Sequence, residues 1–342
     1  MTKLLSLTIV FDWERTLSEF SFLDIGSGKS YYDENEIAFF EKWYKSEAHE
    51  QLTQMVRSEH PTSVYFTGSF LELLVICDEE MVKSLKSAVK KGHIELLGGT
   101  YHHTLSSLYS GFHFDLEVGW HQKLIKKTFG TRTSCFFNTE NIYYNDLAIQ
   151  LKSLGYSSVF TGAIDWYLGP EKSRRIFSSG PEKDFKVLLI SPNQGNSLFQ
   201  DNAVENHFVQ FDSTQLISAG GWNELVRKTS NKASIVTLDS QTAKDQGEEI
   251  YNVRQPISGK YHSIELKQLH EHPLQAGWLK QLYDLAPSIE KKSESIQKTW
   301  SSLSSTSHLK KLNPDLNSGD HNACYDTYQI LINILSDFRL TL

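Results

Sequence analysis

The stretch SCFFNTENIYYNDLAIQLKSLGYSSVFTGA, residues 134–163, contains a complete strand–helix–strand unit. Its two ends, SCFFNTE (134–140) and SSVFTGA (157–163), are short apolar runs that predict buried strands. Between them, NDLAIQLKSLG (145–155) has the apolar spacing of a helix that ends at a glycine. Because a helix that connects two buried strands favours a parallel pair, this unit predicts an α/β fold.

Five more apolar runs extend the same alternation along the chain: LLSLTIVF (4–11), SVYFTGSF (63–70), HIELLGG (93–99), KVLLIS (186–191) and SIVTLDS (234–240). Seven predicted strands with helices between them are enough to form a barrel. After about His262 the apolar residues recur only at helical spacing. We therefore predict a catalytic barrel domain over residues 1–262 and a C-terminal helical domain over residues 263–342.

The composition excludes several classes of protein. The 342 residues carry 41 acidic and 34 basic side chains, a net charge of −7, which argues against a nucleic-acid partner. No apolar run approaches the ~18 residues that a membrane helix needs, and the N-terminal apolar stretch lacks a cleavage site. Three widely spaced cysteines, Cys77, Cys135 and Cys324, suit a reducing compartment. We expect a cytoplasmic protein with no membrane partner.

Polar residues end most of the predicted strands, where a parallel barrel places its reaction face. They are Asp12, Trp13, Glu14, Tyr101, His102, His103, Asn138, Thr139, Glu140, Asp165, Trp166 and Asp239. Two carboxylates from different strands are what glycosidic bond cleavage requires, because one attacks the anomeric carbon and the other protonates the leaving oxygen. Glu140 and Asp239 are the candidates, although acidic residues at strand ends also cap helices.

Several of these segments resemble glycoside hydrolase family 57, in its α-amylase branch. FFNTENIYYNDLAIQLKSLGYSSVFTGAIDWYLG (136–169) resembles the nucleophile region, and ELLGGTYHHTLSSL (95–108) the second conserved region. SIVTLDSQT (234–242), WSSLSSTSHLKKL (300–312) and YDTYQILINILSDF (325–338) resemble the fourth region, the fifth region and the closing helix. The resemblance implies an incomplete seven-stranded (β/α)7 barrel followed by a C-terminal helical bundle. It also implies a retaining mechanism on α-glucans, with no metal or other cofactor.

The resemblance assigns roles to individual residues. It makes Glu140 the nucleophile and Asp239 the acid/base. His103 is expected to bind sugar, and His308 to reach in from the helical domain. With the residues that line the cleft, the candidate substrate-binding set is Asp12, Trp13, Tyr101, His103, Asn138, Asp165, Trp166 and His308.

The sequence also departs from the family pattern. Asp12-Trp13-Glu14 stands where the family has a His-Gln-Pro core, and Gly99 replaces a glutamate. Ser240-Gln241 replaces a Tyr-Glu pair, and Ser307 replaces an aspartate. Each lost hydrogen bond to a charged group could remove ~1.5–3 kcal/mol of transition-state binding.

Three functions remain open at this point. The first is a retaining α-glycoside hydrolase acting on an α-linked oligosaccharide or polysaccharide, with altered specificity. The second is an amylase-like protein that binds oligosaccharide but turns it over poorly. The third is a metal-dependent polysaccharide deacetylase, which Asp12 would suit; however, His102 and His103 are adjacent and His113 is ten residues away, so no pair one helical turn apart forms.

Overall fold

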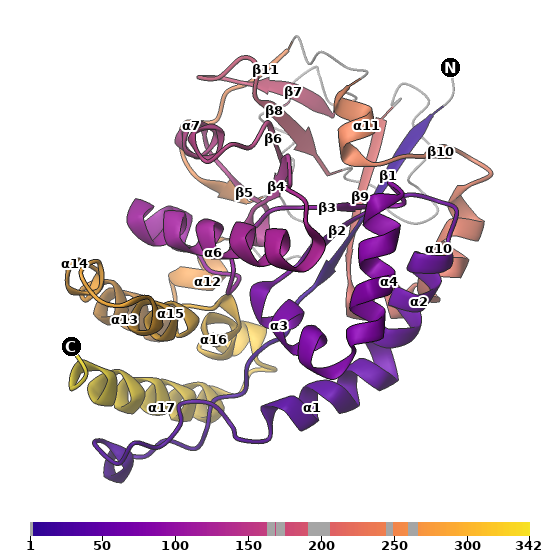
Figure 1. Ribbon diagram of the computed structural model, residues 1–342. Coiled ribbons are helices and arrows are strands. Elements are labelled where there is room, and N and C mark those ends of the chain that lie inside the picture. The colour runs from indigo at the N-terminus through magenta and orange to yellow at the C-terminus, as the bar shows by residue number, and fades with distance from the viewer. Residues whose placement is uncertain (1–2, 163–167, 169–174, 191–205, 244–248, 259–265) are drawn as a thin grey trace.

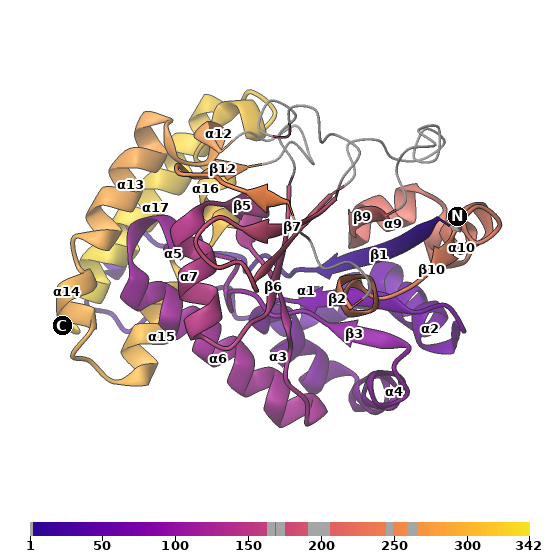
Figure 2. The same ribbon diagram turned by 90° about the horizontal axis from the view of Figure 1, so that it is seen from above.

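The computed structural model describes residues 3–162, 168, 175–190, 206–243, 249–258 and 266–342. Seven parallel strands form an incomplete barrel, visible from two sides in Figure 1 and Figure 2. In spatial order they are β9 (Asn206–Asp212), β1 (Leu4–Phe11), β2 (Thr62–Phe66), β3 (Ile94–Leu96), β4 (Cys135–Phe137), β6 (Ser158–Thr161) and β8 (Lys186–Leu189). The predicted fold class is confirmed.

The register of these strands decides which residues share an end of the barrel. β1 pairs with β9 on one side, with Val10 opposite Asp212, and with β2 on the other, with Phe11 opposite Phe66. A parallel bridge between Gly98 and Phe136 connects the β3 side to β4. In the described part of the chain no ladder joins β8 to β9.

The predicted strand over residues 234–240 is wrong. Only β10 (Ser234–Ile235) is a strand, and it pairs with the first residues of β1. The chain then turns into helix α11 (Leu238–Thr242), because the Thr237 hydroxyl accepts a hydrogen bond from the backbone of Ser240 and caps the helix. The seventh barrel strand is β9, which the sequence analysis did not identify.

Helices cover the outside of the barrel. They are α1 (Glu36–Trp43), α2 (His49–Arg57), α3 (Gly68–Cys77), α4 (Glu79–Lys90), α5 (Ser106–Tyr109), α6 (Gly111–Phe129), α7 (Asn145–Ser153), α9 (Ser213–Ser218) and α10 (Gly221–Thr229). Two short strands extend the sheet beyond β8: β7 (Ile176–Ser179) pairs with β8, and β11 (Ile250–Tyr251) pairs with β7. β5 (Ile142–Tyr143) and β12 (Ile257–Ser258) form a separate two-stranded sheet.

The C-terminal helices gather on one side of the barrel, as the orange and yellow ribbons show in Figure 1 and Figure 2. They are α12 (Lys267–His270), α13 (Pro273–Tyr283), α14 (Ala286–Ile289), α15 (Glu294–Ser302), α16 (Thr306–Lys311) and α17 (His321–Arg339). Trp278, Trp300 and Leu335 are fully buried between them. The expected domain boundary at residue 262 lies outside the described residues.

The barrel interior is filled by side chains and is therefore not a channel. Val10, Tyr65, Phe137 and Phe160 belong to this inner apolar cluster. Leu238 of α11 is fully buried and packs in the same cluster, near the amino-terminal ends of the strands. Within the described residues, α11 thus packs against the amino-terminal end of the barrel interior.

Candidate active site

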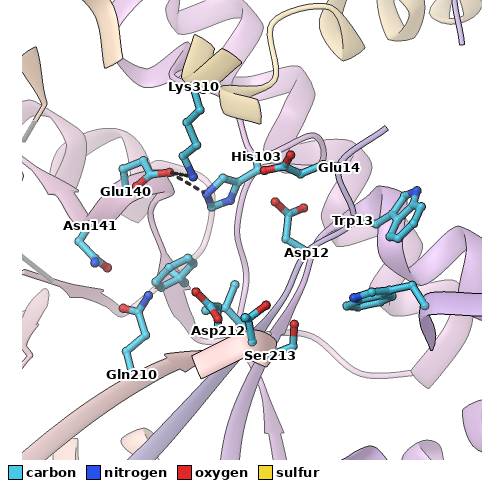
Figure 3. A pocket seen from close by; sticks show the side chains of 14 residues that line it. Asp12, Trp13, Glu14, His103, Glu140, Asn141, Gln210, Asp212, Ser213 and Lys310 are labelled. Atoms are coloured by element: carbon cyan, nitrogen blue, oxygen red, sulfur yellow. Dashed lines mark ion pairs between the residues drawn. The ribbon is translucent and has the colours of Figure 1, made fainter. Parts of the chain in front are cut away.

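A cavity of about 500 Å³ lies at the carboxyl ends of β1, β4 and β9. The side chains that line it are shown in Figure 3. They are Val10, Asp12, Trp13, Glu14, Trp43, His103, Phe137, Glu140, Asn141, Gln210, Asp212, Ser213, Thr214 and Lys310. Polar groups from three barrel strands and from α16 therefore converge on one space.

Strand ends place the acidic residues. β1 ends at Phe11, so Asp12 and Glu14 follow at the rim of the barrel. β9 ends at Asp212, level with Val10 of the neighbouring strand. β4 ends at Phe137, and the 3-10 turn Thr139–Asn141 carries Glu140 into the cavity. This arrangement follows from parallel strands, whose carboxyl ends meet at one face.

The backbone at Glu140 is strained. Its φ of 51° and ψ of 29° lie in the left-handed region, which costs a residue with a side chain about 1–3 kcal/mol. The surrounding structure holds this geometry, since the Ser258 hydroxyl donates a hydrogen bond to the Glu140 carbonyl at 2.8 Å. The next carbonyl, that of Asn141, accepts from Thr161 Oγ1 at 2.6 Å. Such strain typically marks functional positions.

An ammonium group and an imidazole ring face the Glu140 carboxylate. Lys310 Nζ lies 2.8 Å from Oε1, and His103 Nε2 lies 3.6 Å from the same oxygen. Figure 3 shows both side chains directed at Glu140. Burial alone would raise the pKa of Glu140, but the Lys310 ammonium and the His103 imidazole outweigh it and hold that pKa well below its ordinary value. Glu140 is therefore ionised at neutral pH, as a nucleophile must be.

The pKa of Lys310 is shifted in the opposite direction, upward. Burial would lower the pKa of its ammonium, but the charge and hydrogen bond of Glu140, with smaller effects of Glu14 and Asp12, raise it above its ordinary value. The two side chains are only 31% and 10% exposed, so solvent screens the pair weakly. Lys310 and Glu140 thus form a charged pair at neutral pH.

Asp212 lines the cavity together with Glu140, as do the carboxylates of Asp12 and Glu14. One of its oxygens accepts the backbone N–H of Gln215 at 2.7 Å, and the Gln215 side chain accepts the backbone N–H of Asp212 at 3.0 Å. This reciprocal pair is a capping box at the start of α9. The cap fixes the carboxylate at the strand end, where it faces the cavity (Figure 3).

The prediction that Asp239 faces Glu140 is wrong. Both Asp239 oxygens accept from Ser134 Oγ, at 2.8 and 2.7 Å, and Ser134 precedes β4, whereas Glu140 follows it. The Asp239 backbone also donates to Glu95, near the start of β3. Asp239 therefore lies at the amino-terminal end of the barrel and does not line the cavity. The cause is the early end of β10, which turns this segment away from the reaction face.

Three of the predicted substrate-binding residues line the cavity: Asp12, Trp13 and His103. The Trp13 indole forms an aromatic wall with Phe40 and Trp43, at centroid distances of 5.2 and 5.3 Å. Trp13 and Trp43 line the cavity, so one side of it is aromatic, which suits contact with a sugar ring.

Three others do not line it. Tyr101 is 3% exposed and lies against Gly68, where a Cβ would come within 2.5 Å of its ring. Asn138 is buried and donates to the Ile142 carbonyl at 2.9 Å. His308 is buried beside Tyr32, with ring centroids 6.4 Å apart. The structure does not bring these three residues to this cavity, and Asp165 and Trp166 lie outside the described residues.

Three residues that line the cavity were not predicted from the sequence: Asp212, Gln210 and Lys310. A signal for Asp212 was present, because residues 212–215, DSTQ, have the spacing of a capping box directly after HFVQF. No local sequence pattern predicts the role of Lys310, because its contact with Glu140 depends on how α16 packs on the barrel. The helical part does reach the cavity as expected, but through Lys310 and not His308.

The described residues contain no group of three or more His, Cys, Asp or Glu side chains arranged to hold a metal ion. His102, a residue considered for a metal-dependent deacetylase, instead bonds Glu117 at 2.7 Å inside the protein. The geometry therefore adds no support to that alternative. None of the helices in the described ranges has both the length and the apolar composition needed to cross a bilayer.

The chain belongs to glycosyl hydrolase family 57, whose family model matches residues 9–193, more than half of its length. A protein of Methanocaldococcus jannaschii, named "Putative alpha-amylase", is 36% identical over 124 residues, which are 36% of this chain and 26% of that protein. This chain thus matches only about a quarter of that relative. The family resemblance seen in the sequence is confirmed.

Two solved structures share the fold. The branching enzyme of this family from Thermococcus kodakaraensis gives a TM-score of 0.71 at 7% identity, over 98% of this chain and 89% of that one. The 4-alpha-glucanotransferase from Thermococcus litoralis gives 0.66 at 13% identity, over 97% of this chain and 60% of that one. At such low identity these likenesses show the architecture alone.

Proposed function

We propose that this protein is a retaining glycoside hydrolase that acts on α-glucan or malto-oligosaccharide substrates. The observation that carries the proposal is that two carboxylates from separate strands, Glu140 and Asp212, line one sugar-sized cavity. Membership of family 57 and the alpha-amylase name of the Methanocaldococcus relative support the substrate class. The three cysteines are free thiols, which supports a cytoplasmic location.

The proposed reaction is a double displacement. The Glu140 carboxylate attacks the anomeric carbon and forms a glycosyl-enzyme, while Asp212 protonates the leaving oxygen. Asp212 then takes a proton from water, which attacks the anomeric carbon and releases Glu140. His103 and Lys310 keep Glu140 ionised and positioned, and the Trp13 wall supports the sugar ring.

Kinetics of three variants test this assignment. Glu140→Gln and Asp212→Asn are each expected to lower kcat on malto-oligosaccharides by at least 10³-fold, with little change in sugar binding. Asp239→Asn is the matched control, because it removes a carboxylate at the other end of the barrel and should keep kcat within twofold. A large loss in Asp239→Asn, or none in Asp212→Asn, would remove Asp212 from the mechanism.

A second candidate function is an amylase-like oligosaccharide-binding protein with little turnover. The Lys310–Glu140 ion pair at 2.8 Å favours it, because an ammonium bound to the attacking oxygen lowers its nucleophilicity. This candidate predicts negligible turnover by the wild type and a gain in Lys310→Met. The hydrolase predicts measurable wild-type turnover that Glu140→Gln abolishes.

A further inference from the structure

A buried carboxylate outside the cavity receives hydrogen bonds from both parts of the molecule. Glu117 lies on α6 with no exposed surface. Its Oε2 accepts the backbone N–H of His102 at 2.7 Å, and its Oε1 accepts the His102 ring Nδ1–H at 2.7 Å. The Ser301 hydroxyl of α15, which lies beside α6 in Figure 1 and Figure 2, also donates to Oε1. Glu117 thus joins the loop that follows β3 to the C-terminal helices.

The hydrogen-bond network continues from Ser301 into the C-terminal helices. The His113 ring, one turn before Glu117 on α6, lies 2.5 Å from Ser301 Oγ through Nε2 and 3.1 Å from the Tyr283 hydroxyl through Nδ1. Burial lowers the pKa of His113 to about 4, so its ring is neutral at pH 7 and carries one N–H. Because Ser301 donates to Glu117, His113 donates to Ser301 and accepts from Tyr283. Every donor in this network therefore points toward Glu117.

The charge on Glu117 makes these bonds strong. Burial raises the pKa of Glu117, but the charge and the hydrogen bonds of His102 lower it to about 2. A buried carboxylate is stable only when donors surround it, so its donors are held in fixed positions. Glu117 does not line the cavity, and the proposed double displacement makes no use of its charge.

The bonds of Glu117 fix the segment that carries one partner of Glu140. His103 follows His102 directly, and its φ of 53° lies in the left-handed region, which a residue with a side chain adopts only when its surroundings hold it there. The peptide N–H of His102 is bound by Glu117. The orientation of the His103 ring toward Glu140 therefore depends on this buried carboxylate.

The same segment is attached to the helix that carries the other partner of Glu140. The His103 carbonyl accepts the backbone N–H of Thr306, the first residue of α16, at 3.1 Å. Lys310, which pairs with Glu140 at 2.8 Å, lies one turn further along α16. Ser301 belongs to α15, the helix that precedes α16. The bonds of Glu117 thus reach both groups that face Glu140.

We propose that Glu117 is a positioning residue of the candidate active site, which holds His103 and Lys310 beside Glu140 through its bonds to His102 and Ser301. This inference rests on the proposed role of Glu140 and adds a residue that supports it. Glu117 touches no substrate and acts through the backbone of the preceding loop and through α15 and α16. Loss of one of its bonds should loosen Lys310 from Glu140 while the barrel stays folded.

Acetylation of lysines in the intact protein tests the proposal without any need for turnover. Acetic anhydride at trace concentration reacts only with an unprotonated amine, so an ammonium held by a carboxylate reacts slowly. Lys310 and Lys311 are adjacent and similarly exposed, at 31% and 39%, but only Lys310 lies against Glu140. The ratio of acetylation at the two lysines, read by mass spectrometry on one peptide, therefore reports on the pair with Glu140.

Two serine variants localise the effect. Ser301→Ala removes one donor from Glu117 and is milder than Glu117→Gln, which removes a buried charge. Ser6→Ala is the matched control, because Ser6 is equally buried and hydrogen-bonded but lies near the amino-terminal end of β1. We expect the ratio of Lys310 to Lys311 acetylation to rise about threefold in Ser301→Ala and to stay unchanged in Ser6→Ala. Thermal melting confirms that both variants are folded.

A pH profile gives a second readout in an active enzyme. Because Lys310 lowers the pKa of Glu140, a loosened pair raises that pKa. The acidic limb of kcat/KM should therefore move upward by about half a unit in Ser301→Ala and not in Ser6→Ala. A purely structural role of Glu117 would move neither limb, so an unmoved limb in Ser301→Ala overturns the proposal.

The outcomes separate this inference from the proposed function. An unchanged acetylation ratio in Ser301→Ala, or an equal rise in Ser6→Ala, overturns the positioning role of Glu117 even if malto-oligosaccharides are hydrolysed. A rise confined to Ser301→Ala supports that role, even if no glycoside is turned over and the hydrolase proposal fails.

Discussion

Replacing Lys310 with methionine removes the charge that faces the candidate nucleophile while keeping an unbranched side chain. At the observed 2.8 Å, with an effective dielectric constant of about 20, the direct attraction to Glu140 is roughly 6 kcal/mol. The loss of desolvation cost in the variant offsets most of this, so a net effect of about 1.5–3 kcal/mol is expected, as for hydrogen bonds to charged groups. That free energy corresponds to about one to two pKa units.

The sign follows from the direction of the shift. Lys310 lowers the pKa of Glu140, so its removal raises that pKa, and ionised Glu140 is lost at a higher pH. The acidic limb of kcat/KM against pH should therefore move upward by about one to two units in Lys310→Met. Lys310→Arg keeps the charge and should move the limb by less than half as much.

The measurement is a pH profile of kcat/KM on an aryl α-maltooligosaccharide, from the lowest pH at which both proteins stay folded up to pH 9, with folding checked at each pH. An acidic limb in Lys310→Met that coincides with that of the wild type would refute the reasoning. It would mean either that Lys310 does not control the charge of Glu140 or that another group sets the limb.

Three further predictions concern stability and are read by urea unfolding. Glu117→Gln should lower the free energy of unfolding by about 3–5 kcal/mol at pH 7, because it breaks a buried charged network. Burial raises the pKa of Glu117, but the histidine hydrogen-bonded to it lowers that pKa to about 2, so the wild type loses its stability advantage over the variant as the pH falls from about 4.3 to about 2. A difference in stability that does not change with pH would contradict this reasoning. Burial and the neighbouring Asp239 raise the pKa of Glu95 to about 8, which opposes folding as the pH rises from about 4.3 to about 8. Asp239→Asn should therefore gain about 1–2 kcal/mol relative to wild type between pH 5 and 8, and a parallel pH dependence would disprove the coupling. Gly99→Ala should lower the free energy of unfolding by about 1–3 kcal/mol, because a Cβ there would lie 2.2 Å from the buried Tyr65 ring. A variant as stable as the wild type would show that the Tyr65 ring can move aside without cost.

Much of the barrel could be predicted from the sequence because buried parallel strands are continuous apolar runs. LLSLTIVF (4–11) matches β1 in full, and the strand cores at residues 135–137, 158–161 and 186–189 lie inside predicted runs. β9 was not predicted as a strand because its sequence, NHFVQFD, mixes apolar residues with asparagine, histidine and glutamine. Its polar residues are explained only by the structure, in which Gln210 faces the cavity.

Asp239 was predicted in place of Asp212 because the two segments are alike in sequence. Both residues stand in an apolar–Asp–Ser sequence, FDS at 211–213 and LDS at 238–240, and both lie near the start of a helix. The two segments differ in their strands, since Asp212 is the last residue of a seven-residue strand, whereas the strand before Asp239 has only two residues. Strand length is a tertiary property here, because β10 ends where Leu238 enters the barrel interior. Lys310 was equally inaccessible, as its partner lies 170 positions away in the chain.

Trapping of a covalent intermediate tests the mechanism most directly. A 5-fluoro-α-glucosyl fluoride reacts quickly with a retaining enzyme but leaves it slowly, so the sugar stays on the nucleophile. Mass spectrometry of the digested protein should find the label on Glu140, with none on Glu140→Gln. A label on another carboxylate, or turnover with inverted anomeric configuration and no label at all, would contradict the account.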